Sequence, residues 1–122
     1  MEEGSLKMLP KRMHISMGAT ETLRVMKGRT GLTPNIVCRL ALVKSLEDGR
    51  EGGLKKPDMA GSEFNAPTLF GEHAAVFEAL IRQVHGHLDS KTIPLILASH
   101  IDHGLERLRR ARTLGELLSV AL

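Results

Sequence analysis

Histidines and a single cysteine are the side chains of this sequence whose types could support metal or nucleophilic chemistry. His85 and His87 flank a glycine, and His100 and His103 are three residues apart, a spacing that can direct two imidazoles of one helix at an ion. The ligands needed to complete either pair are not clearly arranged. Cys38 lies in the most apolar stretch, which favours a buried structural thiol over a nucleophile. We therefore expect neither a metal site nor a catalytic residue.

The sequence lacks the motifs typical of phosphate-binding and hydrolytic enzymes. The glycine-rich stretch from Gly49 to Gly53 lacks the Gly-Lys-Ser/Thr ending of a phosphate-binding loop, and no dinucleotide fingerprint is present. No Ser-His-Asp spacing is persuasive either. The sequence therefore predicts a protein that is not an enzyme and needs no cofactor.

Positive charge is concentrated in the first half of the chain. The net charge is +3, but positions 7–56 hold eleven Lys or Arg against four Asp or Glu, a local charge of +7. A basic half on a small protein indicates a polyanionic partner, most often nucleic acid, although a solvated basic face is the equally weighted alternative. The chain has no Trp, no Tyr and only three Phe, which argues against the base-stacking surfaces of single-strand and RNA binders.

A predicted turn between two helices is the best candidate for contact with phosphate. Thr33 and Pro34 favour a helix start there, and the backbone amides at a helix N-terminus can hold a phosphate. The alternative is that these two residues only begin a helix. The arginine-rich run 107–112 favours a solvated helical face, though it could extend a basic surface. The residues predicted to bind DNA are Arg12, Arg24, Lys27, Arg29, Thr33, Asn35, Lys55 and Lys56.

The first secondary-structure element that positions these residues is a predicted short strand. Residues 11–17 alternate between polar and apolar side chains, which predicts a strand, and Ser16 or Gly18 then opens a helix that Gly31 ends. The next helix, over residues 36–46, has an apolar stripe wider than a surface helix needs, so we expect a second chain to cover it. This stripe consists of Ile36, Val37, Leu40, Ala41 and Val43.

For residues 48–122, the sequence predicts a long connection followed by helices. Residues 48–71 hold five glycines and two prolines, and we expect this to be the least structured region. Helical spacing predicts helices over 72–88 and 92–103, with Gly104 after the end of the second, and residues 105–112 either continue that helix or form a separate turn. Thr113 and Glu116 fit a capping box that opens a last helix.

The fold class predicted is mainly α, with a ribbon-helix-helix-like N-terminal unit (a short strand plus two helices) and a C-terminal helical half. In such units two chains pair their strands into a ribbon that can enter a DNA groove. Residues 1–7 are expected to be a flexible N-terminal extension, and 8–122 a single domain with a mobile loop at about 48–71. The apolar runs are too short for a membrane span, and we expect a cytoplasmic protein.

Several strings of the sequence resemble the DndE family of bacterial DNA sulfur modification (phosphorothioation) systems. The most specific string is Arg-Thr-Gly-Leu-Thr-Pro-Asn over residues 29–35. Weaker similarity extends to residues 9–16, Leu23, 39–41 and 65–72, and to His100-Ile101 with Gly104. The resemblance covers nearly all of the chain from Met8 onward.

The resemblance implies a non-enzymatic subunit that acts beside the sulfur-transfer proteins, which replace a non-bridging phosphate oxygen of DNA with sulfur. It also implies a homo-oligomer, a tetramer in this family, that binds double-stranded DNA and nicked duplex in particular. Two alternatives stay open: a ribbon-helix-helix transcriptional regulator or antitoxin that reads an operator, and a scaffold that binds proteins without touching DNA.

Overall fold

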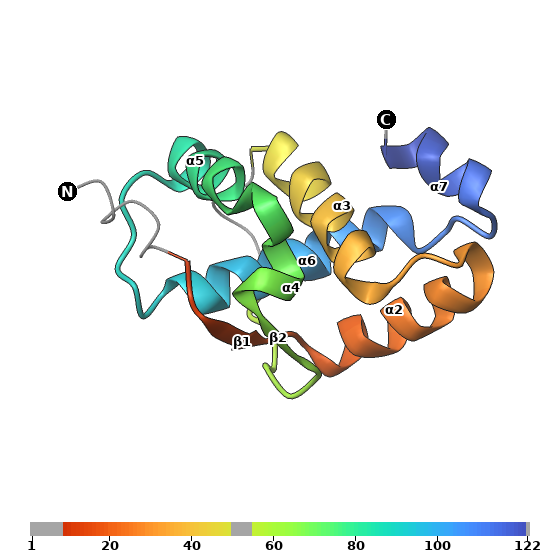
Figure 1. Cartoon of the computed structure of the whole chain (residues 1–122), viewed down its shortest axis with the longest axis horizontal. Helices are drawn as coiled ribbons and strands as arrows, with labels where there is room; N and C mark the ends of the chain where they lie inside the picture. Colours follow the sequence, from red (N-terminus) through yellow and green to blue (C-terminus); the bar gives the residue numbers. More distant parts are fainter. Residues whose placement is uncertain (1–8, 50–54, 122) are drawn as a thin grey trace.

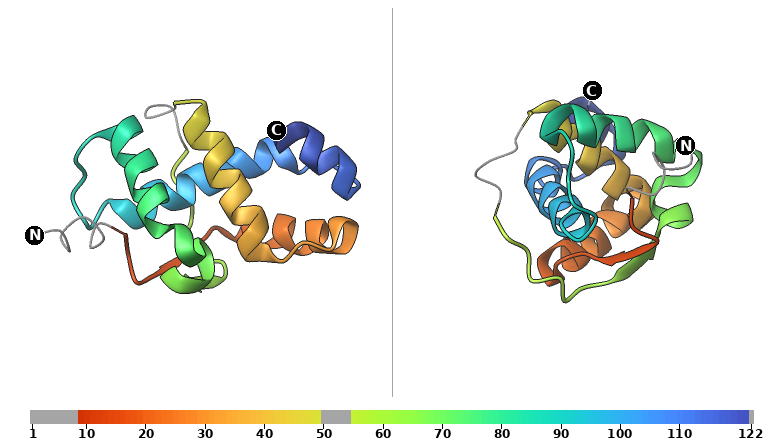
Figure 2. Two further views of the ribbon diagram at one scale, coloured as in Figure 1. Left: turned by 45° about the horizontal axis from the view of Figure 1, so that its top comes forward. Right: turned by 90° about the vertical axis from the view of Figure 1, so that its left-hand side faces the viewer.

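One long helix, α6 (Ile93–Leu108), forms the centre of the molecule, and the other elements pack around it. The structure is a computed structural model that describes residues 9–49 and 55–121. Figure 1 shows α6 running between the two ends of the molecule, and Figure 2 shows α3 (Pro34–Glu47) crossing it. Leu97, Ala98 and Ile101 of α6 are fully buried, so the hydrophobic core follows this helix.

A two-stranded antiparallel ribbon closes one side of the core. It joins β1 (Arg12–His14) to β2 (Glu63–Asn65), with Met13 opposite Phe64. Those two side chains are buried, whereas the residues on either side of them are exposed, so the ribbon presents one apolar face to the helices. The mainly helical fold with a strand–helix–helix N-terminal unit is as predicted. The strand that a ribbon-helix-helix dimer would share, however, pairs here with β2 of its own chain.

The first helix, α2 (Met17–Thr30), begins and ends at the residues that the sequence indicated. The Ser16 hydroxyl accepts a hydrogen bond from the Ala19 amide at 2.9 Å, as an N-cap does. The Asp58 carboxylate, from the segment before β2, accepts from the Met17 amide at 3.0 Å. Gly31 follows the helix with φ of 80°, a left-handed conformation that glycine adopts without steric cost.

Helices α3 and α6 cross at very short range because a glycine lies between them. A Cβ atom at Gly104 would lie 2.0 Å from the Ala41 carbonyl oxygen of α3. Gly104 was predicted to follow the end of a helix at His103, and that prediction is wrong. The helix continues to Leu108, and the glycine lies inside it because only a residue without a side chain allows this approach.

The segment predicted to have the least structure, residues 48–71, contains a strand, a short helix and the start of a 3₁₀ turn, while residues 50–54 lie outside the described part. Strand β2 is followed by the short helix α4 (Ala66–Phe70) and the 3₁₀ turn η1 (Gly71–His73). Arg39 of α3 anchors α4, since its guanidinium donates to the carbonyls of Leu69 at 2.7 Å and Thr68 at 3.1 Å. The expectation of little structure is therefore wrong for residues 63–71.

Helices α5 (Ala74–His85) and α7 (Leu114–Ala121) complete the fold. Phe77 and Ile81 carry the apolar face of α5 into the core. At the start of α7 the Thr113 hydroxyl accepts from the Glu116 amide at 3.1 Å, as the capping box predicted. The Glu116 carboxylate accepts in turn from the amide of Arg112, one residue earlier than the standard motif. Among the described residues, no helix has the length and apolar character to cross a membrane. The predicted extension 1–7 lies outside them.

Candidate nucleic-acid interface

Three of the predicted DNA-binding residues lie together on the second half of α2. Arg24, Lys27 and Arg29 are all exposed, and the last two lie in the final turn, where positive charge interacts favourably with the helix dipole. Arg24 forms an ion pair with Glu21 on the surface of the same helix. The hydrogen bond and the charge of Arg24 lower the pKa of the Glu21 carboxyl. Arg24 is therefore partly neutralised, whereas Lys27 and Arg29 extend beyond it toward the end of the molecule.

The end of α2 meets the turn between α6 and α7, and the two form a groove. The Arg29 guanidinium donates to the Arg109 carbonyl at 3.2 Å and so fixes the turn against the helix. The groove has a volume of about 460 Å³. We call it the arginine groove; its lining residues are Glu21, Thr22, Val25, Met26, Arg29, Arg109, Arg110 and Arg112. Four guanidinium groups and one carboxylate line it, and Arg109 is also paired with Glu106 at 3.3 Å, so the balance of charge is positive in this concavity at the end of the molecule where α7 begins (Figure 1).

A second hollow, of about 440 Å³, adjoins the arginine groove and shares Thr22 and Arg109 with it. Its charge is mixed, because Lys55 and Arg109 face Asp102 and Glu106 there. The Ser16 hydroxyl donates to the Asp102 carboxylate at 2.6 Å, and burial raises the pKa of that carboxyl. A polyanion would meet these carboxylates, so this hollow is less suited to DNA than its neighbour.

The start of α3 differs from the prediction in one respect. Thr33 precedes the helix, but its hydroxyl does not cap a backbone amide and instead donates to the Asn35 side-chain oxygen at 2.6 Å. The amides of Ile36 and Val37 both donate to the Thr33 carbonyl, at 3.1 and 3.2 Å. These contacts occupy two of the amides that were expected to hold a phosphate.

The remaining predicted residues do not join the arginine groove. Arg12 is exposed on β1 opposite Asn65, before the N-terminal end of α2. Lys55 lines the mixed hollow, and Lys56 is exposed next to the buried Pro57. Of the eight predicted residues, the structure thus brings Arg29 alone into the groove lining, with Lys27 and Arg24 nearby on α2.

The three arginines that complete the groove were interpreted from the sequence as a solvated helical face. The signal that could have identified them is the end of α6 at Leu108. Arg109, Arg110 and Arg112 follow that end, so they belong to a turn and can point to one side together. Arg107 is still helical, and its guanidinium contacts the Asp48 carboxylate at 2.5 Å.

Three of the histidines contact one another or a serine, and the cysteine is buried in the core. His100 and His103 both contact the hydroxyl of Ser45, and His85 contacts His100. Within residues 9–49 and 55–121, no three or more His, Cys, Asp or Glu side chains gather as a metal would require. Cys38 is buried, and burial raises the pKa of its thiol to about 12. The thiol therefore stays protonated and unreactive.

Comparison with known proteins gives one consistent result. Residues 12–116 match the family described as "DNA sulphur modification protein DndE". The crystal structure of DndE from Escherichia coli B7A, involved in DNA phosphorothioation modification, superposes with a TM-score of 0.72 at 29% identity, covering 80% of this chain and 95% of that one. A double glycine-to-lysine mutant of DndE, involved in DNA phosphorothioation, gives a TM-score of 0.70 at 28% identity, covering 84% and 100%. No curated protein sequence matches.

Proposed function

The chain belongs to the DndE family of DNA sulphur modification proteins, and from this premise we propose that it is a non-enzymatic subunit that binds duplex DNA through the arginine groove. It acts in the cytoplasm beside the other proteins of a DNA phosphorothioation system. The observation that carries this proposal is the convergence of Arg29 with three arginines of the α6–α7 turn on one concave surface.

The chemistry of the groove suits the phosphate backbone. Guanidinium groups bind phosphate through two parallel hydrogen bonds and remain charged at every physiological pH. The three phenylalanines, the only aromatic residues among Phe, Trp and Tyr, are all buried and offer no surface on which bases could stack. Binding directed at phosphates, rather than at unstacked bases, is therefore the mode that these residues support.

The absence of catalysis is supported by the state of the candidate nucleophile. The Cys38 side chain is fully buried in α3, and its raised thiol pKa keeps it protonated. The sulfur chemistry of the system is then the work of partner proteins, and this chain contributes DNA contact.

A homo-oligomer, a tetramer by family resemblance, is part of the proposal. Val37 and Ala41 of the predicted stripe are buried within the chain itself. Ile36 and Val43 stay exposed and Leu40 is half-buried, so a narrower apolar stripe remains on the outside of α3. Leu40→Asp would place an unpaired charge in that contact. Light scattering should then detect a smaller species, and a wild-type chain that is monomeric at micromolar concentration would contradict the oligomer.

The test of DNA binding is a titration of the full chain with intact, nicked and single-stranded DNA at several salt concentrations. Each phosphate contact on B-form DNA contributes about 0.9 to the slope of log affinity against log salt. A variant with Arg110→Ala and Arg112→Ala should therefore bind more weakly and lose about 1.8 from that slope. Nicked duplex should bind more tightly than intact duplex, because a nick removes part of the energy needed to bend DNA.

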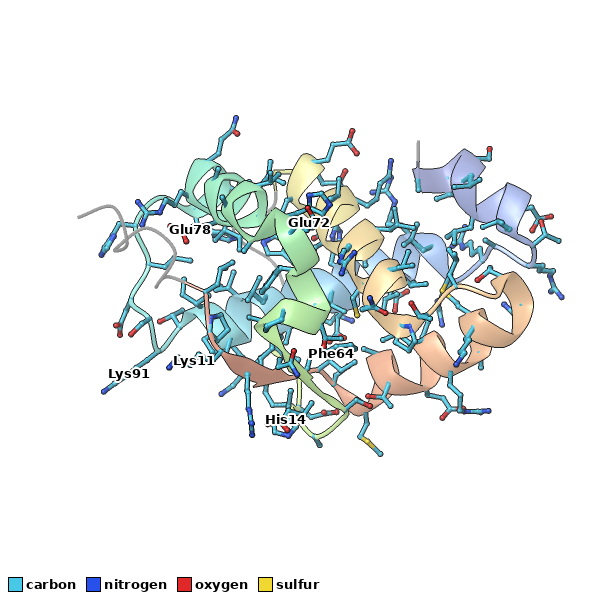
Figure 3. The ribbon with its side chains drawn as sticks, in the orientation of Figure 1. Lys11, His14, Phe64, Glu72, Glu78 and Lys91 are labelled. Carbon is cyan, nitrogen blue, oxygen red and sulfur yellow. The ribbon has the colours of Figure 1, made fainter. Side chains whose placement is uncertain are left out.

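The matched control removes two positive charges elsewhere. Lys11 and Lys91 are exposed at the opposite end of the molecule from the arginine groove (Figure 3). Lys11→Ala with Lys91→Ala should leave most of the affinity and the slope intact. Equal loss in both double variants would assign binding to overall charge and not to the groove. If the wild type shows no salt-dependent binding, the protein-binding scaffold becomes the better description.

A further inference from the structure

A chain of three histidines and one serine crosses the interior where α3, α5 and α6 meet. The Ser45 hydroxyl oxygen lies 2.6 Å from Nδ1 of His100 and 2.8 Å from Nδ1 of His103. On the other side of the same ring, Nε2 of His100 lies 2.7 Å from Nε2 of His85. Ser45 and His100 are fully buried. We call these four residues the histidine–serine chain.

The number of protons decides whether these contacts are favourable. A serine hydroxyl has one proton, so Ser45 can donate to one ring and accept from the other. A neutral imidazole also has one N–H, so His100 can donate on one side and accept on the other. With neutral rings all three contacts can therefore be hydrogen bonds. If His85 and His100 are both protonated, two N–H groups point at each other across 2.7 Å and the contact becomes repulsive.

The charges around the chain do not neutralise a proton on His100. Both nitrogens of its ring are already occupied, by Ser45 and by His85, and neither partner is a carboxylate. From the end of α3, Asp48 lies 4.0 Å from Nε2 of His103 and is itself paired with Arg107 of α6.

Two other acidic residues near the chain are also engaged elsewhere. On α5, the Oε2 atom of Glu78 is paired with Arg82 at 3.3 Å, whereas its buried Oε1 atom has no hydrogen-bond partner among the described residues. Asp102 of α6 turns to Ser16 at the start of α2. A positive charge on His100 would thus be buried without a direct counter-ion, and burial together with His85 and His103 lowers the pKa of His100 to about 4.

The end of α5 is the part that can separate most easily. Phe77 and Ile81 anchor the first turns of the helix in the core. Between Ile81 and Ile93 no residue is fully buried, and the apolar contact with the core comes from the partly buried Val84 and Leu88, so less apolar surface would be exposed here than at Phe77 and Ile81. The contact between His85 and His100 is a polar link between this stretch and α6.

We propose that the contact between His85 and His100 is an acid-sensitive clasp that holds the end of α5 against α6 while both rings are neutral and releases residues 82–92 when they take up protons. The release is local, because α3 and α6 remain joined through their apolar crossing at Gly104. The inference concerns regulation within the fold and does not depend on DNA binding.

The test is hydrogen exchange of the full chain at pH 7.5 and pH 5.0, corrected for the intrinsic pH dependence of exchange. Protection of residues 82–92 should fall at the lower pH, by at most about 25-fold, the limit for one imidazole that regains its ordinary pKa when the clasp opens. Protection in the middle of α3 and α6 should stay unchanged. Equal protection of residues 82–92 at the two pH values would overturn the proposal.

Three variants assign the effect to the clasp. His100→Gln keeps a side chain that can donate and accept but cannot titrate, and it should abolish the pH response. His85→Gln, at a less buried position, should reduce the response, and it serves as the test if the first variant does not fold. His87→Gln changes an exposed histidine two residues further on and should respond like the wild type. A response of wild-type size in His100→Gln, or in His85→Gln where the former does not fold, would overturn the proposal.

Discussion

The arginine groove and the histidine–serine chain place ionisable side chains in opposite environments. In the groove, Arg110 and Arg112 are exposed and remain hydrated, so their charge costs the fold little. In the chain, His100 is fully buried, and each of its nitrogens depends on a neighbour. The comparison teaches that substitutions at exposed arginines can test the proposed DNA binding with little change in stability, whereas the loss of a buried polar partner lowers the stability of the fold.

The interior should be most sensitive at the crossing of α3 and α6. Gly104→Ala puts a Cβ within 2.0 Å of the Ala41 carbonyl oxygen, so the two helices must separate, and we expect a loss of more than about 3 kcal/mol in the free energy of unfolding. The matched control is Gly28→Ala on the exposed surface of α2, where nothing lies within 4 Å. It should stabilise by about 0.5–1 kcal/mol, as alanine does in a helix. Urea unfolding of both variants measures this, and losses of equal size would contradict the close crossing.

Ser45→Ala should have the next largest effect. It leaves Nδ1 of His100 and Nδ1 of His103 without their shared partner, and each unsatisfied buried group costs about 1–3 kcal/mol. We expect a total loss of about 3 kcal/mol, with His103 contributing less because it is only partly buried. Ser90→Ala, at an exposed position, serves as the control and should change the free energy of unfolding by less than about 0.5 kcal/mol.

Acid should weaken the fold through His100. Its pKa is lowered from 6.5 to about 4 by burial first and by His85 and His103 second. As pH falls below 6.5, the unfolded chain takes up this proton before the folded chain does, so the free energy of unfolding falls by about 2 kcal/mol between pH 7 and pH 5. Asp102 acts in the opposite direction, because burial raises the pKa of its carboxyl. Comparing urea unfolding of wild type and His100→Gln at each pH cancels that contribution; parallel curves would refute the role of His100.

The smallest effect on stability is expected in the groove. Arg112 is exposed, and its backbone amide, which Arg112→Ala retains, makes the contact with Glu116. The free energy of unfolding should therefore change by less than about 0.5 kcal/mol. The salt slope of DNA binding should nevertheless fall by about 0.9, the contribution of one phosphate contact. If Arg112→Ala lowered the free energy of unfolding and left DNA binding unchanged, Arg112 would stabilise the fold and would not contact DNA.

The parts of the fold that could be predicted from the sequence are those fixed by local signals. Ser16 and Gly31 delimit α2, and Thr33-Pro34 marks the start of α3, because capping and turn residues act within a few positions of themselves. Strand β2 was missed because it is three residues long, with one buried side chain, and depends on β1 for its hydrogen bonds. Gly104 has the local features of a helix end, and its close approach to Ala41 depends on a contact across the fold.

The candidate interface was predictable in its charge but not in its shape. Arg29 and Arg109 are far apart in the sequence, and only the packing of α2 beside α6 brings them into contact. The histidine–serine chain shows the same limit. The spacing of His100 and His103 indicated that they could share a partner, but no local signal identifies that partner as Ser45 of another helix.

The pairing of β1 with β2 has a consequence for the order in which the chain folds. The ribbon joins Arg12 to Asn65, so it closes a loop that includes all of α2 and α3. Contacts between distant parts of a chain form late, because the entropy of loop closure must be lost before the contacts repay it. During synthesis the first strand and the two helices after it leave the ribosome before their strand partner does. A nascent chain that ends before Glu63 therefore leaves β1 without its strand partner, and the N-terminal unit is completed only after β2 has been synthesised.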